Sequence, residues 1–381
     1  MIKSCTRCIY DENVSGISFD VEGICCYCRQ IETLSKDFKT ATPDGEREFE
    51  RIVDKIKRDG RNKKYDVVIG VSGGTDSSYM LHLAKEKRLR PLAVHYDNTW
   101  NTAIATQNIK KVITKLNIDL YTYVIDCHEQ NQILLAFMKA GICGADAATD
   151  LALAEIMYRA ANKHGIKYVF EGHSFQAEGV SPIGNSYTDG QFIKSVVKNH
   201  SKIRLSSYPN MTFFRFLRWI IFARIKKIRP LWYLKYNKDS AQKLLEKEYG
   251  WEYYGGHHLE NRIASFDHSF LMPNKFNVDQ RNNSLSAAVR SGFISRKKAI
   301  EEYAKEPVLE EGLLEYVKKR LQLSDQDFED IMNGPIRTFK DYKTYKKRFE
   351  RLRLLFYFLA KANLVPMSFY YKYCFPIKEQ K

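Results

Sequence analysis

The stretch DVVIGVSGGTDSSYMLHLAKEK (66–87) joins an apolar run to a small, hydroxyl-rich loop and then to a helix-forming segment. The run YDVVIGV (65–71) predicts a buried strand, and a helix is expected from about Asp76. The two glycines leave room for a ligand to approach the backbone, and the first amides of the helix face that ligand. We therefore predict phosphate binding by the 71–78 loop, through Ser72, Gly73, Gly74, Thr75, Asp76, Ser77 and Ser78.

Asp76 suits an anion site only where a cation bridges it, and Mg²⁺ bound with ATP would supply that cation. The lysine of G-x-x-x-x-G-K-[ST] is missing, as is the pattern G-x-G-x-x-G. SGGTDS is instead similar to the S-G-G-x-D-S loop of the PP-loop ATP pyrophosphatases, which implies that the loop holds the departing pyrophosphate of ATP. An ordinary strand-to-helix turn capped by Asp76 is the alternative.

Strands and helices are expected to alternate after this loop, which is typical of a parallel sheet covered by helices. The expected strands are 65–71, 89–96, 120–126 and 167–172, and the expected helices are 76–87, 102–117 and 150–165. We predict an α/β fold of the PP-loop (HUP, adenine nucleotide alpha hydrolase-like) type. Its domains are expected at 1–45 (a zinc module), 46–200 (the PP-loop domain) and 201–381 (mostly helical, for substrate or partner binding).

Four of the eight cysteines, Cys5, Cys8, Cys25 and Cys28, form a C-x₂-C pair followed by a second C-x₂-C pair. This spacing predicts a tetrahedral zinc site with a structural role, because four thiolates leave no open position for catalysis. Cys26 is expected to be the spare thiol. An iron–sulfur cluster is the alternative.

Two further stretches carry groups suited to phosphate chemistry. EGHSFQAEG (171–179) ends an expected strand, and Gly172 in it is a further expected ATP-binding residue. His173 is expected to contact a phosphate or the activated substrate, or to act as an indirect hydrogen-bond partner. Beyond it, several cations gather beside Asp279, as a site that neutralises a diphosphate requires. These cations are Lys275, Arg281, Arg290 and Arg296.

The chain has 61 Lys and Arg against 45 Asp and Glu, a formal net charge of +16 that favours anionic partners. The basic, aromatic segment 213–236 is expected to be a buried helix. Its alternatives are peripheral membrane contact and an RNA-stacking surface. No signal-like stretch or membrane-spanning run is recognised, so the cytoplasm is the expected location.

Taken together, the cysteine pairs, SGGTDSS, the GH…E stretch and the segment from WEYYGGHHLE to PNKFNVDQR resemble the N-acetyl sugar amidotransferases of surface-polysaccharide biosynthesis (the WbpG/WbuX/PseA type). The resemblance covers residues 1 to about 305. It implies that ATP adenylates the acetamido group of a nucleotide-linked N-acetyl sugar and that ammonia then replaces the oxygen. Asp76, His173, Lys275 and Arg281 are the expected catalytic residues, with no nucleic acid as partner.

The family reading also implies that ammonia comes from a separate glutaminase and a tunnel-forming subunit, similar to those of imidazole glycerol phosphate synthase. Cys127 and Cys143 are accordingly expected to be structural. A tRNA thiolase is the rival function, because it can join a zinc module to a PP-loop domain and suits a basic chain. It would need a catalytic cysteine pair or an iron–sulfur triad in the α/β domain, and no C-x₂-C pair follows residue 130. A non-catalytic nucleotide sensor is a third reading.

Overall fold

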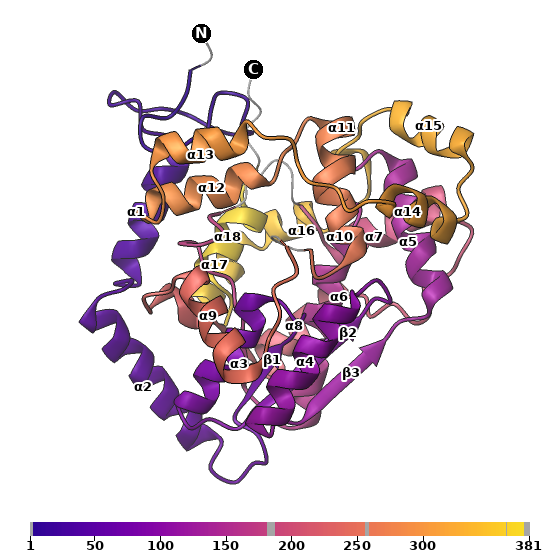
Figure 1. Cartoon of the computed structure of the whole chain (residues 1–381). Helices are drawn as coiled ribbons and strands as arrows, with labels where there is room; N and C mark the ends of the chain where they lie inside the picture. Colours follow the sequence, from indigo (N-terminus) through magenta and orange to yellow (C-terminus); the bar gives the residue numbers. More distant parts are fainter. Residues whose placement is uncertain (1–2, 181–186, 256–258, 363, 377–381) are drawn as a thin grey trace.

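The computed structural model describes residues 3–180, 187–255, 259–362 and 364–376, and these form a sheet of five parallel strands (Figure 1). The order across the sheet is β3-β2-β1-β4-β5, so β1, which precedes the 71–78 loop, is the central strand. The strands are β1 (Val67–Gly70), β2 (Pro91–Asp97), β3 (Leu120–Val124), β4 (Tyr168–Phe170) and β5 (Lys226–Ile228).

Helices surround the sheet and make up most of the C-terminal half of the chain. Up to the end of β5 they are α1 (Cys26–Asp37), α2 (Pro43–Asp59), α3 (Thr75–Glu86), α4 (Ala103–Leu116), α5 (Cys127–Ala140), α6 (Ala147–Lys163), α7 (Gly190–His200), α8 (Phe213–Leu217) and the π-helix η2 (Arg218–Phe222). After β5 come the short helix η3 (Pro230–Trp232), α9 (Lys238–Tyr249), α10 (Arg262–Phe266), the π-helix η4 (Asp267–Leu271), α11 (Met272–Phe276), α12 (Arg281–Arg290) and α13 (Arg296–Tyr303). The last are α14 (Leu313–Leu321), α15 (Asp325–Asn333), the short helix η5 (Phe339–Asp341), α16 (Lys346–Arg351), α17 (Arg353–Lys361) and α18 (Met367–Cys374).

The central strand is buried on both faces, because successive side chains of a strand point to opposite sides. Val67 and Ile69 pack into a core formed with α2, α3, α4 and α9. Val68 packs on the other face, into a core formed with α5, α6 and α7. Each such side chain contributes about 1.5–3 kcal/mol to folding. The strand that carries the 71–78 loop is therefore held rigidly in a three-layer α/β/α arrangement.

The sheet order also fixes where a ligand can bind. The chain runs from β1 to β2 and β3 on one side, and then returns to place β4 and β5 on the other side. In open parallel sheets, ligands bind at the carboxyl ends of the strands where the order reverses in this way. The 71–78 loop follows β1 and the Gly172–His173 stretch follows β4, so both lie at that point.

The predicted α/β fold with a parallel sheet is confirmed, and all four expected strands are present. The expectation of one helix over 213–236 was wrong. That segment divides into α8, η2, β5 and η3, because β5 pairs with β4 at the edge of the sheet. The sheet thus extends beyond residue 200, where we expected the PP-loop domain to end. The helix α5 was not anticipated either.

The C-terminal helices form two further cores. One joins α10, η4, α14 and α15 to α5, and the other joins α16, α17 and α18 to α8 and η2. Phe214 and Phe222 leave 74% and 81% of their surface exposed at this second core, and the membrane contact predicted for 213–236 stays a prediction. None of the helices in the described part of the chain has the length and apolarity that crossing a bilayer requires.

Candidate active site and metal centre

The 71–78 loop has one conformation that its neighbours enforce. Gly73 has φ +84°, and a Cβ there would lie 2.2 Å from the carbonyl oxygen of Ala105 in α4. The Gly73 carbonyl oxygen accepts a hydrogen bond of 3.0 Å from Nε1 of the buried Trp251. Only glycine fits this position, because any side chain would displace α4.

The hydroxyl groups of the loop mainly hold its own backbone. Ser77 Oγ accepts from the Ser72 amide (3.3 Å) and donates to the Gly74 carbonyl (3.1 Å), and Ser72 Oγ accepts from the Gly74 amide (3.3 Å). Thr75 Oγ1 accepts from Gln242 in α9 (3.3 Å), and the Ser78 amide donates to Gly74 at the start of α3. The loop is thus preorganised, with the first turn of α3 as its source of amides for an anion.

Asp76 lies in that first turn and has two partners, one just before α9 and one at the first position of α9. The Tyr236 hydroxyl donates to Asp76 Oδ1, and Lys238 Nζ lies 3.1 Å from Asp76 Oδ2. Burial alone would lower the pKa of Lys238, but Asp76 and then Glu178 outweigh it and raise that pKa. An ammonium group therefore faces the Asp76 carboxylate at neutral pH.

Gly172 and His173 lie directly beside the loop. A Cβ at Gly172 would lie 3.4 Å from the carbonyl group of Asp76, so the two segments are in contact. Trp232 Nε1 donates to His173 Nδ1 over 3.3 Å, and His173 Nε2 lies 3.9 Å from Glu178. Burial, with a contribution from Arg229, lowers the pKa of His173 to about 4. At neutral pH the ring is uncharged, and its proton is on Nε2, because Nδ1 accepts from the tryptophan.

Two further side chains, those of Glu260 and Tyr254, lie against the loop. Sequence reasoning assigned no role to either of them. Ser72 Oγ donates to Glu260 Oε1 over 3.3 Å, and the backbone of Glu260 accepts from the Thr102 amide over 3.0 Å. The Tyr254 hydroxyl lies 3.1 Å from the position of a Cβ on Gly74. With Lys238 and Tyr236 they complete the site. All four lie more than 150 positions from the loop, although Tyr254 and Glu260 belong to the WEYYGGHHLE stretch on which the family resemblance partly depends.

The predicted cationic cluster does not assemble around the loop. Lys275 Nζ donates to the carbonyls of Ile331 (2.5 Å), Met332 (3.1 Å) and Gly334 (2.8 Å) and so caps the end of α15. Arg281 pairs with Asp279 over 2.6 Å and also donates to the Tyr303 carbonyl. Lys275 and Arg281 therefore both have structural contacts within the protein. Their assignment as catalytic residues stays a prediction.

The four predicted cysteines do come together. Their Sγ atoms all lie within 4.8 Å of one another, with 3.9 Å between Cys5 and Cys28 and 3.8 Å between Cys8 and Cys25. A tetrahedral zinc ion with Zn–S bonds of about 2.3 Å requires S–S edges of about 3.8 Å. Backbone amides of residues 7, 8, 25 and 28 point at Cys5 or Cys25 Sγ, which stabilises negative charge on sulfur. All four residues are almost completely buried, so the donor set fits a closed, structural metal site.

The other two predicted cations contact the cysteine cluster instead. Arg290 donates from Nε to Cys28 Sγ (3.2 Å) and from Nη2 to Cys8 Sγ (3.5 Å), and it stacks over Tyr10. Arg296 donates to the backbone carbonyls of Cys8 (2.9 Å) and Cys5 (3.0 Å). Through these contacts α12 and α13 dock beside α1, as Figure 1 shows.

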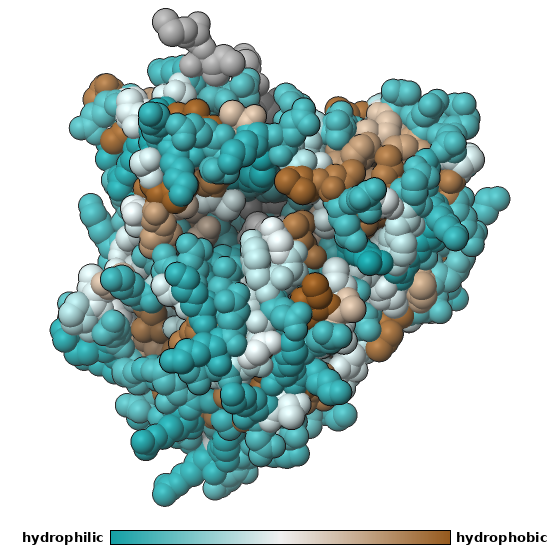
Figure 2. Space-filling model, viewed as in Figure 1, coloured by the Kyte–Doolittle hydropathy of each residue, from teal (hydrophilic) through white to brown (hydrophobic). Residues whose placement is uncertain are grey.

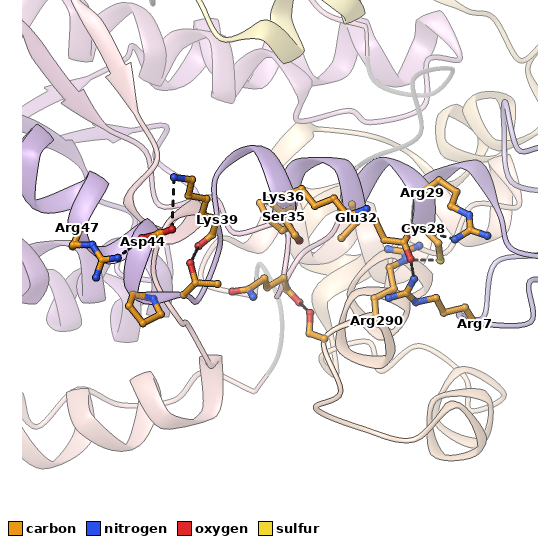
Figure 3. A pocket seen from close by; sticks show the side chains of 16 residues that line it. Arg7, Cys28, Arg29, Glu32, Ser35, Lys36, Lys39, Asp44, Arg47 and Arg290 are labelled. Carbon is orange, nitrogen blue, oxygen red and sulfur yellow. Dashed lines mark hydrogen bonds and ion pairs between the residues drawn. The ribbon is translucent and has the colours of Figure 1, made fainter.

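A trough of about 1000 Å³ lies next to the cysteine cluster and not over the 71–78 loop. Figure 3 shows Arg290 and Cys28 at one end of it and Lys39, Asp44 and Arg47 at the other. The Asp44 carboxylate already pairs with Lys39 and Arg47. Figure 2 shows a largely hydrophilic face that is hollowed below α12, between the upper helices and α9 and α4.

Residues 260–354 match the family model described as LPS biosynthesis protein WbpG-like, C-terminal domain. No curated protein matches the chain. The solved structures that are similar include NMN synthetase from Francisella tularensis, with 16% identity over 54% of this chain and 92% of that one (TM-score 0.28). NH3-dependent NAD synthetase from Campylobacter jejuni is 13% identical, over 75% of this chain and 95% of that one, with a TM-score of 0.29. The U34-tRNA thiolase NcsA from Methanococcus maripaludis is 14% identical, over 85% of this chain and 100% of that one, with a TM-score of 0.31.

Proposed function

We propose, on the premise that residues 260–354 are a WbpG-like C-terminal domain, that the chain is an ATP-dependent amidotransferase acting on a nucleotide-linked N-acetyl sugar. The acetamido oxygen attacks the α-phosphorus of ATP, and the bond from that phosphorus to the β-phosphate oxygen breaks. Ammonia then adds to the activated carbon, and AMP leaves with the former acetamido oxygen. The product is an acetamidino sugar for surface polysaccharide, such as the O-antigen of a lipopolysaccharide.

The contact between Glu260 and Ser72 carries this proposal. Glu260 is the first residue of the WbpG-like segment, and its carboxylate accepts a hydrogen bond from the hydroxyl that begins the SGGTDSS stretch. The segment that resembles a sugar-modifying family therefore adjoins the loop that resembles a pyrophosphate-binding one. A nucleotide on the loop and a sugar held by the adjoining segment would meet at the carboxyl edge of the sheet.

The residues at this edge suit positioning and charge neutralisation, and no covalent nucleophile is needed. The loop and the first turn of α3 would hold the pyrophosphate part of ATP, and Asp76 would hold Mg²⁺. Mg²⁺, when bound, would neutralise charge on the phosphates. His173 would donate from Nε2 to a phosphate oxygen or to the activated substrate, since its ring is neutral at pH 7. The four cysteines would hold structural Zn²⁺.

Ammonia would come from a separate glutaminase through a tunnel-forming subunit. Burial, with a contribution from Asp267, raises the pKa of Cys143 to about 12, and a thiol of that kind is a poor nucleophile at neutral pH. The rival thiolase chemistry is not favoured either. Among the described residues, the one group of three or more potential metal ligands is the N-terminal cysteine cluster, which leaves Cys127 and Cys143 ungrouped.

The test is AMP and pyrophosphate formation from MgATP with ammonium and a panel of UDP- and CMP-linked N-acetyl sugars, with tRNA as the competing substrate. Asp76→Asn should lower AMP formation by about 100-fold or more, since it removes a charge that holds the metal and phosphates. Asp239→Asn, an exposed acid on α9, is the matched control and should retain activity. AMP formation with tRNA alone, or wild-type turnover in Asp76→Asn, would contradict the proposal.

A further inference from the structure

The charge around the 71–78 loop is unsuited to a polyphosphate without an added cation. The loop itself contains no lysine or arginine. The Asp76 carboxylate lies within it, and Glu260 accepts from Ser72 directly above it. The charges of both acids, and that of Glu178, act on the same ammonium group. Departing pyrophosphate adds further negative charge, so the site needs a protein cation besides any bound metal.

Lys238 is that cation by position. Its Nζ lies 3.1 Å from Asp76 Oδ2, and its side chain is 24% exposed while that of Asp76 is 16% exposed. It is the first residue of α9, and Gln242 on the next turn of α9 donates to Thr75 in the loop. The N-terminal ends of α3 and α9 therefore meet at Asp76, and both helix dipoles favour an anion there.

The other cations of the neighbourhood have anionic or carbonyl partners elsewhere. Arg229 pairs with Glu171 over 2.5 Å, and Lys227 pairs with the same carboxylate over 2.8 Å. Lys275 caps α15, and Arg290 covers the cysteine cluster. In the described part of the chain, Lys238 is the cation whose ion pair includes an acid of the 71–78 loop.

We propose that Lys238 binds the pyrophosphate part of ATP, which deepens the proposed function and rests on it. Before nucleotide binds, Lys238 Nζ compensates the charge of Asp76. Asp76 would hold the Mg²⁺ that accompanies ATP, and the flexible side chain of Lys238 would then place Nζ against oxygens of the β- and γ-phosphates. As the bond to the α-phosphorus breaks, the electron pair stays on the bridging oxygen of pyrophosphate. Nζ keeps its three protons throughout.

The experiment titrates the purified full chain with magnesium pyrophosphate, with AMP and with MgATP by calorimetry. Lys238→Met should weaken pyrophosphate and MgATP binding about tenfold or more, because it removes a charged hydrogen-bond donor. AMP binding should change by less than about twofold. Lys238→Arg keeps the charge and should restore most of the pyrophosphate affinity. Lys243→Met, an exposed lysine on the same helix, should bind all three ligands as the wild type does.

The outcomes separate this inference from the proposed function. If Lys238→Met binds pyrophosphate as tightly as the wild type does, the inference is overturned. The proposed function would still stand in that case, provided that the wild-type protein forms AMP from ATP and the sugar. Equal losses of AMP and pyrophosphate binding, with a lowered melting temperature in both Lys238 variants, would also overturn it, because they would indicate a purely structural ion pair. A wild type that binds neither ATP nor pyrophosphate would remove both.

Discussion

In both the four-cysteine cluster and the 71–78 loop, a cation from a later part of the chain contacts side chains that can carry negative charge. Arg290 reaches Cys28 and Cys8, and Lys238 reaches Asp76. The sites differ in how their own groups are assembled. All four thiols lie between residues 5 and 28 and are closed off from solvent. The loop site draws on the ends of β1 and β4, on α9 and on Glu260. A short stretch of sequence therefore encodes one site, whereas the other is assembled from distant segments.

The sharpest way to break this comparison is to remove one thiol. Cys28→Ser should lose the metal and unfold the N-terminal module, because structural zinc contributes about 10–16 kcal/mol to modules of this kind. Cys26→Ser is the matched control, since Cys26 lies outside the cluster. Metal content by mass spectrometry and thermal melting measure both effects. Unchanged metal in Cys28→Ser, or equal loss in Cys26→Ser, would refute the ligand set.

A smaller effect is expected when the covering cation is removed. Arg290→Gln should weaken metal affinity by about 10- to 100-fold, as expected for a group that supports the ligands and not for a ligand itself. Arg296→Gln should weaken metal affinity less, because Arg296 donates to carbonyl oxygens and not to sulfur. Competition against a coloured chelator gives both affinities. Equal losses would mean that the arginines matter for docking α12 and α13 and not for the thiolate charge.

A further test concerns how acid changes the stability of the fold through His173. Its pKa of about 4 in the folded protein lies below the value of about 6.5 in an unfolded chain, so the unfolded chain binds the extra proton between these values. The free energy of unfolding should therefore fall as the pH falls from about 6.5 to about 4. Urea unfolding should show a weaker dependence in His173→Gln, while His128→Gln, at an exposed histidine, should match the wild type. A steeper dependence in His173→Gln would contradict this assignment.

The sequence predicted those parts of the molecule that short-range patterns encode. The apolar run before Ser72 and the hydroxyl-rich turn after it define one β–α unit, and C-x₂-C spacing defines a metal ligand set. The short edge strand β5 was missed, because Lys226 and Lys227 make it read as a basic helix. Its strand form comes from pairing with β4, which no local propensity reveals.

Contacts between distant segments also explain why the predicted cluster of cations did not form around the loop. Lys275, Arg281, Arg290 and Arg296 lie near one another in sequence and suggested a single phosphate-neutralising cluster. The structure distributes them among the end of α15, Asp279 and the cysteine cluster. The lysine that does reach the loop, Lys238, stands in an unremarkable NKDS stretch that caps α9. Charge counted along a sequence indicates a kind of partner, but only the fold assigns each charge to one.

The long separation between Arg290 and Cys28 also sets an order of events during synthesis. Arg290 follows Cys28 by 262 positions. A ribosome that adds about 5–20 residues per second makes the arginine tens of seconds after the last thiol. The contacts from α12 to Cys28 and Cys8 can form only after that interval. A metal ion that bound the four thiols earlier would be covered by Arg290 once α12 has been made.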